Sequence, residues 1–385
     1  MRAHVLLPLF AALVLLVTAL SVGSPIFLAG GVLILLLVAF CWLSVRWSAA
    51  SLRLRCETAP ARVQRGEHCL LRLTAVRRCP LPVAPMEALV HLGPRSLERL
   101  TLAEDSRGGQ TVELPFTAGH VGVSPVGVET LKVTDVFGLF EKTLHPRETL
   151  SELLVLPRPF DLAPLVFAPL DQGMGTMARA TEDLSSPSDV RAFQPGDAMK
   201  KVHWKLSARR QELMVRRFEE PILPESLILM CAKTPEGPIA PLIWDGLVET
   251  AASLLVRERE CGHTSTLPLH GRQPCVIHSG MALQDGLERL ARAEPDPGEK
   301  LEQLLAVESR RIRASGALAV VTADLTASAA QQLARLRHQG PTVRLCLVTE
   351  DPGRPDWQML IYTLQNAGAE VDYVEVGSLP PEVEP

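Results

Sequence analysis

Two long apolar runs open the chain. Residues 5–22 are almost entirely apolar, and residues 26–45 form a second run without a single charge. As a helix that rises about 1.5 Å per residue, each run can cross a hydrocarbon core of about 30 Å. The Gly23-Ser24-Pro25 break between them allows only a tight turn. The pattern predicts two N-terminal transmembrane helices, packed as a hairpin over residues 1–47.

The residues that flank these runs predict an orientation. Arg2 precedes the hairpin, and basic residues follow it at Arg46, Arg53 and Arg55. Basic residues gather on the cytoplasmic side, so both ends of the hairpin are expected there. A cleaved signal peptide followed by one anchor is the alternative, but Pro25 disfavours cleavage after Val22-Gly23-Ser24. We expect a two-helix protein of the inner (cytoplasmic) membrane, with the bilayer as a partner and its soluble domains in the cytoplasm.

An alternation of apolar and polar residues follows. Leu52, Leu54 and Cys56 alternate with arginines, and the same period of two recurs at residues 71–75 and 112–116. Proline and glycine separate these short runs, and residues 153–159 form the last of them. Short strands separated by turn residues are typical of an antiparallel β-sandwich, which we place at residues 48–160.

The period changes in the second half of the chain. Residues 161–189 show no apolar period and are expected to be a linker loop. From residue 225 to 385, short apolar runs alternate with segments of helical spacing. The expected strands are 226–230, 275–278, 317–321, 343–348 and 371–376, and the expected helices are 243–259, 283–293, 326–337 and 356–367. This alternation predicts an α/β domain with a parallel sheet and right-handed crossovers.

Composition excludes several functions. The chain has 385 residues and a net charge of −4, and it lacks a recognised nucleic-acid motif, so we expect no nucleic-acid partner. The 8 cysteines are scattered without a C-x-x-C pair, which argues against a zinc cluster. The phosphate-binding loop, the G-x-S-x-G elbow and H-E-x-x-H are also missing from the sequence. We therefore expect no catalytic residues, no cofactor and no enzymatic activity.

The segment 190–224 is the most distinctive. A Pro195-Gly196 turn forces a chain reversal, and Asp197 stands where it can cap a following helix. His203 and Trp204 come next, and we expect them to pack with Arg191 and Asp197 in a polar network. Basic residues outnumber acidic ones here, which is also typical of a solvated helix face.

This arrangement resembles the core motif of the bacterial "domain of unknown function 58" family, R-x-Y-x-P-G-D-x-x-R-x-I-H-W-x-x-S-A-R. The matching residues are Arg191, Pro195, Gly196, Asp197, His203, Trp204, Ser207, Ala208 and Arg209, with Phe193 in the place of the tyrosine. A second family landmark, D-P-F-G-L, resembles residues 135–139, where Val136 replaces the proline.

The resemblance implies both a fold and a role. It implies that the C-terminal domain is Rossmann-like, of the von Willebrand factor type A-like class. It also implies a membrane-anchored adaptor that works with a MoxR-type AAA+ ATPase, and with other membrane proteins, in protein maturation or envelope stress. The motif residues, Phe193 and Arg209 among them, would then bind the partner.

Two other classes of function remain open on the sequence. Type A domains often hold Mg²⁺ through D-x-S-x-S after the first strand, but Cys231 and Lys233 occupy that neighbourhood here. Asp324 begins a D-x-T-x-S run after a later strand, so it is the candidate ligand for a metal-dependent receptor. We favour its other role, a helix cap. A hydrolase built on His203, Asp197 and Ser207 is the third hypothesis, although the sequence shows no oxyanion donor for it.

Overall fold

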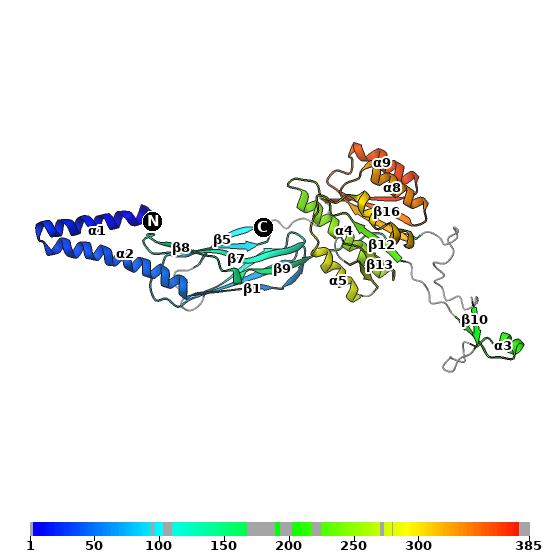
Figure 1. The fold of residues 1–385 in the computed structure, drawn as a ribbon, viewed down its shortest axis with the longest axis horizontal. Helices are drawn as coiled ribbons and strands as arrows, with labels where there is room; N and C mark the ends of the chain where they lie inside the picture. The colour runs from blue at the N-terminus through cyan, green and yellow to red at the C-terminus, as the bar shows by residue number, and fades with distance from the viewer. Residues whose placement is uncertain are drawn as a thin grey trace. The chain divides into compact units, whose positions relative to one another are not determined.

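The structure is a computed structural model that describes residues 3–93, 96–102, 110–167, 189–192, 202–217, 225–269, 273–278 and 280–376. These residues form two compact units (Figure 1). The first holds the residues up to Arg158 together with 287–294, and the second holds 159–286 and 295–376. Each unit is described by itself.

The first unit begins with two packed helices, α1 (Ala3–Val22) and α2 (Pro25–Ser51). Both are long and apolar enough to cross a membrane, as the sequence predicts. Val5, Ala12 and Ala19 recur every seventh position of α1 and are buried against α2. On α2, a Cβ at Gly31 would lie only 2.8 Å from Leu16 Cγ. Small residues thus let the two helices approach closely, as in other membrane helix pairs.

The end of α2 belongs to the β-strand module that follows. Val45 is part of the module's buried core. Ser44 Oγ donates to the carbonyl of Pro82 at 2.5 Å, and Ser48 Oγ accepts from Arg77 Nη1 at 3.2 Å. The helix runs on to Ser51, so the boundary expected at residue 47 falls inside it.

The β module consists of two sheets around one core. The first sheet has the antiparallel order β1-β3-β6, formed by β1 (Leu52–Ala59), β3 (His68–Arg77) and β6 (Gln110–Thr117). The second has the order β2-β9-β7-β4-β5, with β8 paired to β7. Its strands are β2 (Arg62–Gln64), β4 (Met86–Leu92), β5 (Leu97–Leu102), β7 (Gly122–Thr134), β8 (Glu141–Leu144) and β9 (Ser151–Leu156). One pair departs from the antiparallel expectation, because β2 runs parallel to β9.

The core of this module follows from the alternation in the sequence. Leu71, Leu73 and Ala75 of β3 are fully buried, and their intervening neighbours face outward or are half-buried. Side chains of both sheets contribute to the same apolar cluster. A short 3₁₀ turn, Arg147–Thr149, lies so close to β7 that a Cβ at Gly127 would come within 2.2 Å of the Thr149 carbonyl oxygen.

The second unit contains a six-stranded sheet of order β14-β13-β12-β15-β16-β17. The strands are β12 (Glu225–Met230), β13 (Thr264–Leu267), β14 (Cys275–Ile277), β15 (Ala317–Thr322), β16 (Thr342–Thr349) and β17 (Glu370–Glu375). All neighbours pair in parallel except β14, which runs antiparallel to β13. From β12 the chain first adds β13 and β14 on one side of the sheet and then β15, β16 and β17 on the other, so the order of strands reverses between β12 and β15.

Helices cover both faces of this sheet (Figure 1). Helix α4 (Ala240–Glu260) packs on β12, β13, β15 and β16. Leu227, Leu229 and Cys231 point to the other face, where they join a core that includes side chains of the remaining helices. These are α6 (Leu301–Val307), α7 (Ser309–Ala314), α8 (Ala327–His338) and α9 (Pro355–Asn366). Helix α5 (Gly280–Ala291) follows β14.

The first residues of the expected linker dock onto this sheet domain. The Phe160 amide donates to Ser253 Oγ at 2.9 Å, and the Leu165 amide donates to the buried carboxylate of Glu258 at 2.8 Å. Arg344 Nη1 donates to the Ala163 carbonyl at 2.5 Å. Residues 161–167 form neither helix nor strand, as expected of a loop, but side chains of the domain bind several of their backbone groups. Residues 168–188, the rest of that prediction, lie outside the described residues.

Candidate functional site

The motif segment forms a small hairpin around a short helix. Strands β10 (Asp189–Ala192) and β11 (Met214–Arg217) pair antiparallel, with Arg191 opposite Val215. Helix α3 (Trp204–Arg210) lies between them in sequence. Val202, Ser207 and Met214 are buried within this hairpin. Four motif residues, Phe193, Pro195, Gly196 and Asp197, lie outside the described residues.

His203 and Ser207 act as structural residues here. His203 is the N-cap of α3, and its Nδ1 accepts from the Leu206 amide at 3.3 Å. The Ser207 hydroxyl donates to the His203 carbonyl at 3.1 Å and accepts from the Met214 amide at 2.9 Å. Its hydrogen bond therefore runs to a backbone oxygen and not to the imidazole ring, unlike the nucleophile–base pair that a hydrolase needs. The serine instead fastens the helix start to β11.

Trp204 departs from the expected packed network. Its side chain is 61% exposed on α3. Lys205, Arg209 and Arg210 are exposed on the same short helix. Trp204 is therefore not buried as expected, and its expected partners, Asp197 and the side chain of Arg191, lie outside the described part of the chain. Its indole ring is presented to solvent beside several cations.

A second cluster lies at the carboxyl ends of β12 and β15, where the strand order reverses. Ligands of open α/β sheets bind at this kind of switch point. Lys233 follows β12, Asp324 follows β15, and their Nζ and Oδ2 atoms are 2.7 Å apart. The hydrogen bond to Asp324, together with its negative charge, raises the pKa of Lys233 above its usual 10.5. The ammonium thus stays charged at neutral pH and neutralises Asp324.

Other side-chain oxygens at this edge that could bind a cation are also engaged in hydrogen bonds. The Thr326 and Ser328 hydroxyls both donate to Glu302 Oε1, and Glu299 Oε2 accepts from the Ala232 amide. Burial acts to raise the pKa of Glu302, but the hydrogen bonds from Ser328 and Thr326 outweigh it and leave that pKa below 4.5. Glu302 is therefore ionised at neutral pH.

Helix α8 is capped by a residue other than the expected one. Thr326 is the N-cap, and its hydroxyl accepts from the Ala329 amide at 3.1 Å. The prediction of an Asp324 cap is therefore wrong. The backbone of Asp324 is fixed instead by Thr322, whose hydroxyl accepts from the Asp324 amide at 3.2 Å.

The residues at this edge do not fit a divalent cation. Asp324 is paired with an ammonium, and Cys231 is a buried thiol whose pKa burial raises to about 11. Mg²⁺ prefers an octahedron of oxygen ligands, which this set does not offer. Within the described residues, no group of three His, Cys, Asp or Glu side chains converges as a metal site.

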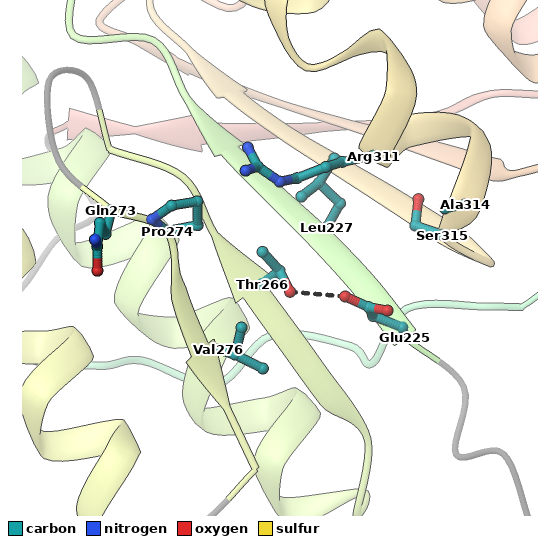
Figure 2. A pocket seen from close by; sticks show the side chains of 9 residues that line it. All are labelled: Glu225, Leu227, Thr266, Gln273, Pro274, Val276, Arg311, Ala314 and Ser315. Carbon is teal, nitrogen blue, oxygen red and sulfur yellow. Dashed lines mark hydrogen bonds between the residues drawn. The ribbon is translucent and has the colours of Figure 1, made fainter.

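A cavity of about 390 Å³ lies near the opposite end of β12, away from the Lys233–Asp324 pair. Its floor includes Leu227 and Val276. Figure 2 shows Arg311 reaching from α7 across β12, and Glu225 facing Thr266 at a hydrogen-bond distance of 2.8 Å. The Arg311 guanidinium also binds Glu308 at 2.5 Å. The cavity has an apolar floor and a charged rim, but the sequence motif lies elsewhere.

The sequence could not place these two sites. Lys233 and Asp324 are far apart in the chain, and only the strand order brings them together. The usable signal was that each of the two residues follows a predicted strand of a parallel sheet, because the carboxyl ends of parallel strands meet at one edge. The cavity has no sequence signature, because its walls come from three strands and a helix that was not predicted.

The fold and sites define an α/β domain that follows a β module and two apolar helices. Residues 189–350 match the family described as "Protein of unknown function DUF58". The match begins at β10 and ends just after β16, so it covers the motif hairpin and most of the α/β sheet. No curated protein sequence matches the chain.

Solved structures give only distant similarity. Cwp6 from Clostridium difficile matches with 9% identity and a TM-score of 0.19, over 84% of this chain and 37% of that one. A cycloisomaltooligosaccharide glucanotransferase of Paenibacillus sp. matches with 8% identity and a TM-score of 0.16, over 76% and 44% of the two chains. The chain thus spans less than half the length of either, and such low scores carry no argument about function.

Proposed function

We propose that this protein is a membrane-anchored, non-enzymatic scaffold that docks a partner protein through the motif hairpin. In this proposal the partner is a MoxR-type AAA+ ATPase, and the soluble domains lie on the cytoplasmic side. The β module would be a β-sandwich, and the α/β domain would be of the von Willebrand factor type A-like class. Support comes from the two apolar helices, the family match and the strand order of the sheet.

The observation that carries the proposal is the exposure of Trp204 on a basic helix. Tryptophan and arginine dominate the binding energy of protein interfaces, because they bury large areas and form directional contacts. An exposed indole among cations favours a partner surface with an apolar pocket and an acidic rim. His203 Nδ1 and the Ser207 hydroxyl are already used within the hairpin, so they hold the helix in place for docking.

The test is an in-cell crosslink of the full-length protein, followed by mass spectrometry of the captured partners. Trp204→Ala and Arg209→Ala are compared with Tyr362→Ala, which removes an equally exposed aromatic ring from α9, at 62% exposure. We expect an AAA+ ATPase with the unchanged protein and the Tyr362 variant, and at least a tenfold loss with the Trp204 variant. Equal recovery with every variant would show that the hairpin does not dock the partner. Absence of any ATPase would remove the proposed partner.

A further inference from the structure

The turn between β7 and β8 presents two apolar side chains to solvent. Val136 and Phe137 are 53% and 62% exposed. The turn leads directly into β8, and both β7 and β8 pack against α2. This turn is the segment that resembles the second family landmark, yet docking through the motif hairpin gives it no role. Exposed apolar side chains that form one patch with their neighbours mark protein or membrane interaction sites.

The conformation of this turn is fixed by a buried carboxylate. Asp135 is only 1% exposed, and its two oxygens accept from the Phe137 amide at 3.0 Å and the Phe140 amide at 2.6 Å. The Gly138 amide donates to the Asp135 carbonyl at 3.0 Å, and Gly138 has a φ of 69° that favours glycine. The exposed pair is therefore held rigidly in place, which lowers the entropic cost of binding.

Contacts along α2 show how far along the helix axis, toward its apolar run, this turn lies. Ser48 contacts Arg77, Ser44 contacts Pro82, and Cys41 lies beside Asp135. At about 1.5 Å per residue, the Asp135 contact lies about 10 Å further along the helix toward the apolar run than the Arg77 contact. Cys41 itself belongs to that apolar run. Of these three contacts, the one at the β7–β8 turn lies nearest to the apolar run of α2.

The neighbouring residues of α2 have the character of a membrane interface. Trp42 is exposed next to Cys41, and the Arg46 guanidinium lies over its ring at 5.4 Å from the centroid. Tryptophan concentrates at the level of the lipid headgroups, with basic residues on the aqueous side. Arg46 lies about 7 Å from Cys41 along the helix axis, so the turn is on the lipid side of this arginine.

We propose that the β7–β8 turn inserts into the bilayer interface, with Val136 and Phe137 in contact with lipid beside Trp42. The protein then contacts the membrane through this turn of the β module as well as through α1 and α2. This inference assumes that α1 and α2 lie in a bilayer, and it is independent of any docked ATPase. A lipid surface accounts for the exposure of the pair, since neither side chain faces water when the protein is inserted.

The test uses full-length protein in vesicles of phosphatidylcholine and phosphatidylglycerol. Single cysteines carrying an environment-sensitive fluorophore replace Phe137, Val123 or Leu36, in a Cys261→Ser background that removes the exposed native thiol. Val123 is the matched control, because it is exposed and apolar at the other end of β7, about 40 Å away along the strand. Leu36, on an exposed face of α2, reports on the spanning region.

We expect the label at position 137 to be quenched by lipids brominated near the headgroup and protected at least fivefold from aqueous iodide relative to position 123. The label at position 36 is expected to be quenched by lipids brominated deeper in the chain. If position 137 is as accessible to iodide as position 123, the turn lies in water and the proposal is wrong. If position 36 is also open to iodide, the helices are not in the bilayer, and the proposal fails with them.

Discussion

Single side chains decide the chemistry at the carboxyl ends of β12 and β15. The ammonium of Lys233 lies where a type A domain would need a metal ligand, and it neutralises Asp324 directly. The hydroxyls of Thr326 and Ser328 are directed at Glu302 instead of at an ion. One basic residue therefore removes Asp324 as a free ligand for a divalent cation at this edge.

This arrangement predicts that the protein's stability is independent of magnesium. Millimolar Mg²⁺ should leave the Tm of the full-length protein in detergent unchanged, because binding would have to displace the ammonium from Asp324. The measurement is a thermal shift with and without Mg²⁺, with Ca²⁺ as a second probe. A saturable rise in Tm that disappears in Asp324→Ala would contradict the prediction and restore the metal-dependent receptor as a hypothesis.

The Glu302 carboxylate predicts a pH-dependent effect of Ser328→Ala. Its pKa is lowered in the folded protein, so the stabilisation is present above its usual value of 4.5 and is lost as pH falls through the folded value. Ser328→Ala should lower stability by about 1 kcal/mol at pH 7, or about 2–4 °C in Tm, and the difference should shrink toward pH 3.

The control for this effect is the same substitution in a Glu302→Gln background. The neutral amide cannot titrate, so the cost of Ser328→Ala should then be the same at both pH values. A pH-independent cost in the unchanged background would show that the hydroxyl does not interact with the ionised carboxylate.

At the scale of elements, α2 and α3 differ from what their sequences alone predict. Helix α2 continues past the apolar run, because Ser44, Val45 and Ser48 pack into the β module. Helix α3 has only seven residues and depends on hydrogen bonds from its flanks, which Ser207 and His203 provide.

The packing of α2 predicts that the β module needs the end of this helix. A chain shortened to begin at Ser48 loses Ser44 and Val45 from the module, and should be destabilised by about 2–4 kcal/mol relative to one that begins at Phe40. Urea denaturation in mild detergent, followed by near-UV circular dichroism, measures the difference. Equal midpoints would mean that the module's core closes without α2.

The hairpin predicts that Ser207→Ala loosens α3. The substitution leaves the buried Met214 amide without its hydroxyl acceptor, a cost of about 1–3 kcal/mol. Trypsin should then cleave after Arg209 or Arg210 several times faster, while Ser207→Thr, which keeps a hydroxyl, should stay close to the unchanged protein. Unaltered cleavage in the alanine variant would show that the hydroxyl does not hold the hairpin together.

The spacing of apolar residues was sufficient to predict most helices and strands of the α/β domain, but not to predict which strands pair. The helices now labelled α4, α5, α8 and α9 and five of the six strands of the α/β sheet were predicted within a few residues, because their apolar faces are buried in this domain. Strand β13 has the polar sequence Thr-Ser-Thr-Leu, and α6 and α7 are short, so none gives a clear period. The parallel pairing of β2 with β9 is invisible locally, because it joins residues far apart in the chain.

The candidate sites were predicted less well than the fold. The motif singled out His203 and Ser207 as partner-binding residues, but not the hydrogen bonds by which they cap α3 and join it to β11. Burial of Trp204 was expected from the usual behaviour of tryptophan and not from any local pattern. Asp324 was recognised as polar and strand-terminal, but its partner Lys233 follows another strand. Which residue pairs with Asp324 depends on the order of strands in the sheet, and a single sequence does not reveal that order.

At the scale of the whole molecule, the cysteines differ in exposure and therefore in reactivity. All eight are free, six are buried and one, Cys261, is exposed. Burial raises the pKa of Cys346 to about 12 and that of Cys231 to about 11, so both stay protonated at neutral pH.

Maleimide labelling of the folded protein at neutral pH should therefore modify Cys261 first, because the thiolate is the reactive form and this side chain alone is exposed. Peptide mass spectrometry identifies the modified residue, and Cys261→Ser should remove the fast phase. Equally rapid modification of Cys231 or Cys346 would show that the α/β core opens readily.

The continuous passage of α2 into the β module has a mechanical consequence. With no loop at the end of the helix, the module has no hinge where it joins α2. Membrane helices tilt to match the local bilayer thickness, so with α2 in a bilayer any such tilt would be transmitted to the module at the same angle. Thinner or thicker membranes would therefore incline the module differently, and lipid composition becomes a variable that sets which of its surfaces a neighbouring protein can reach.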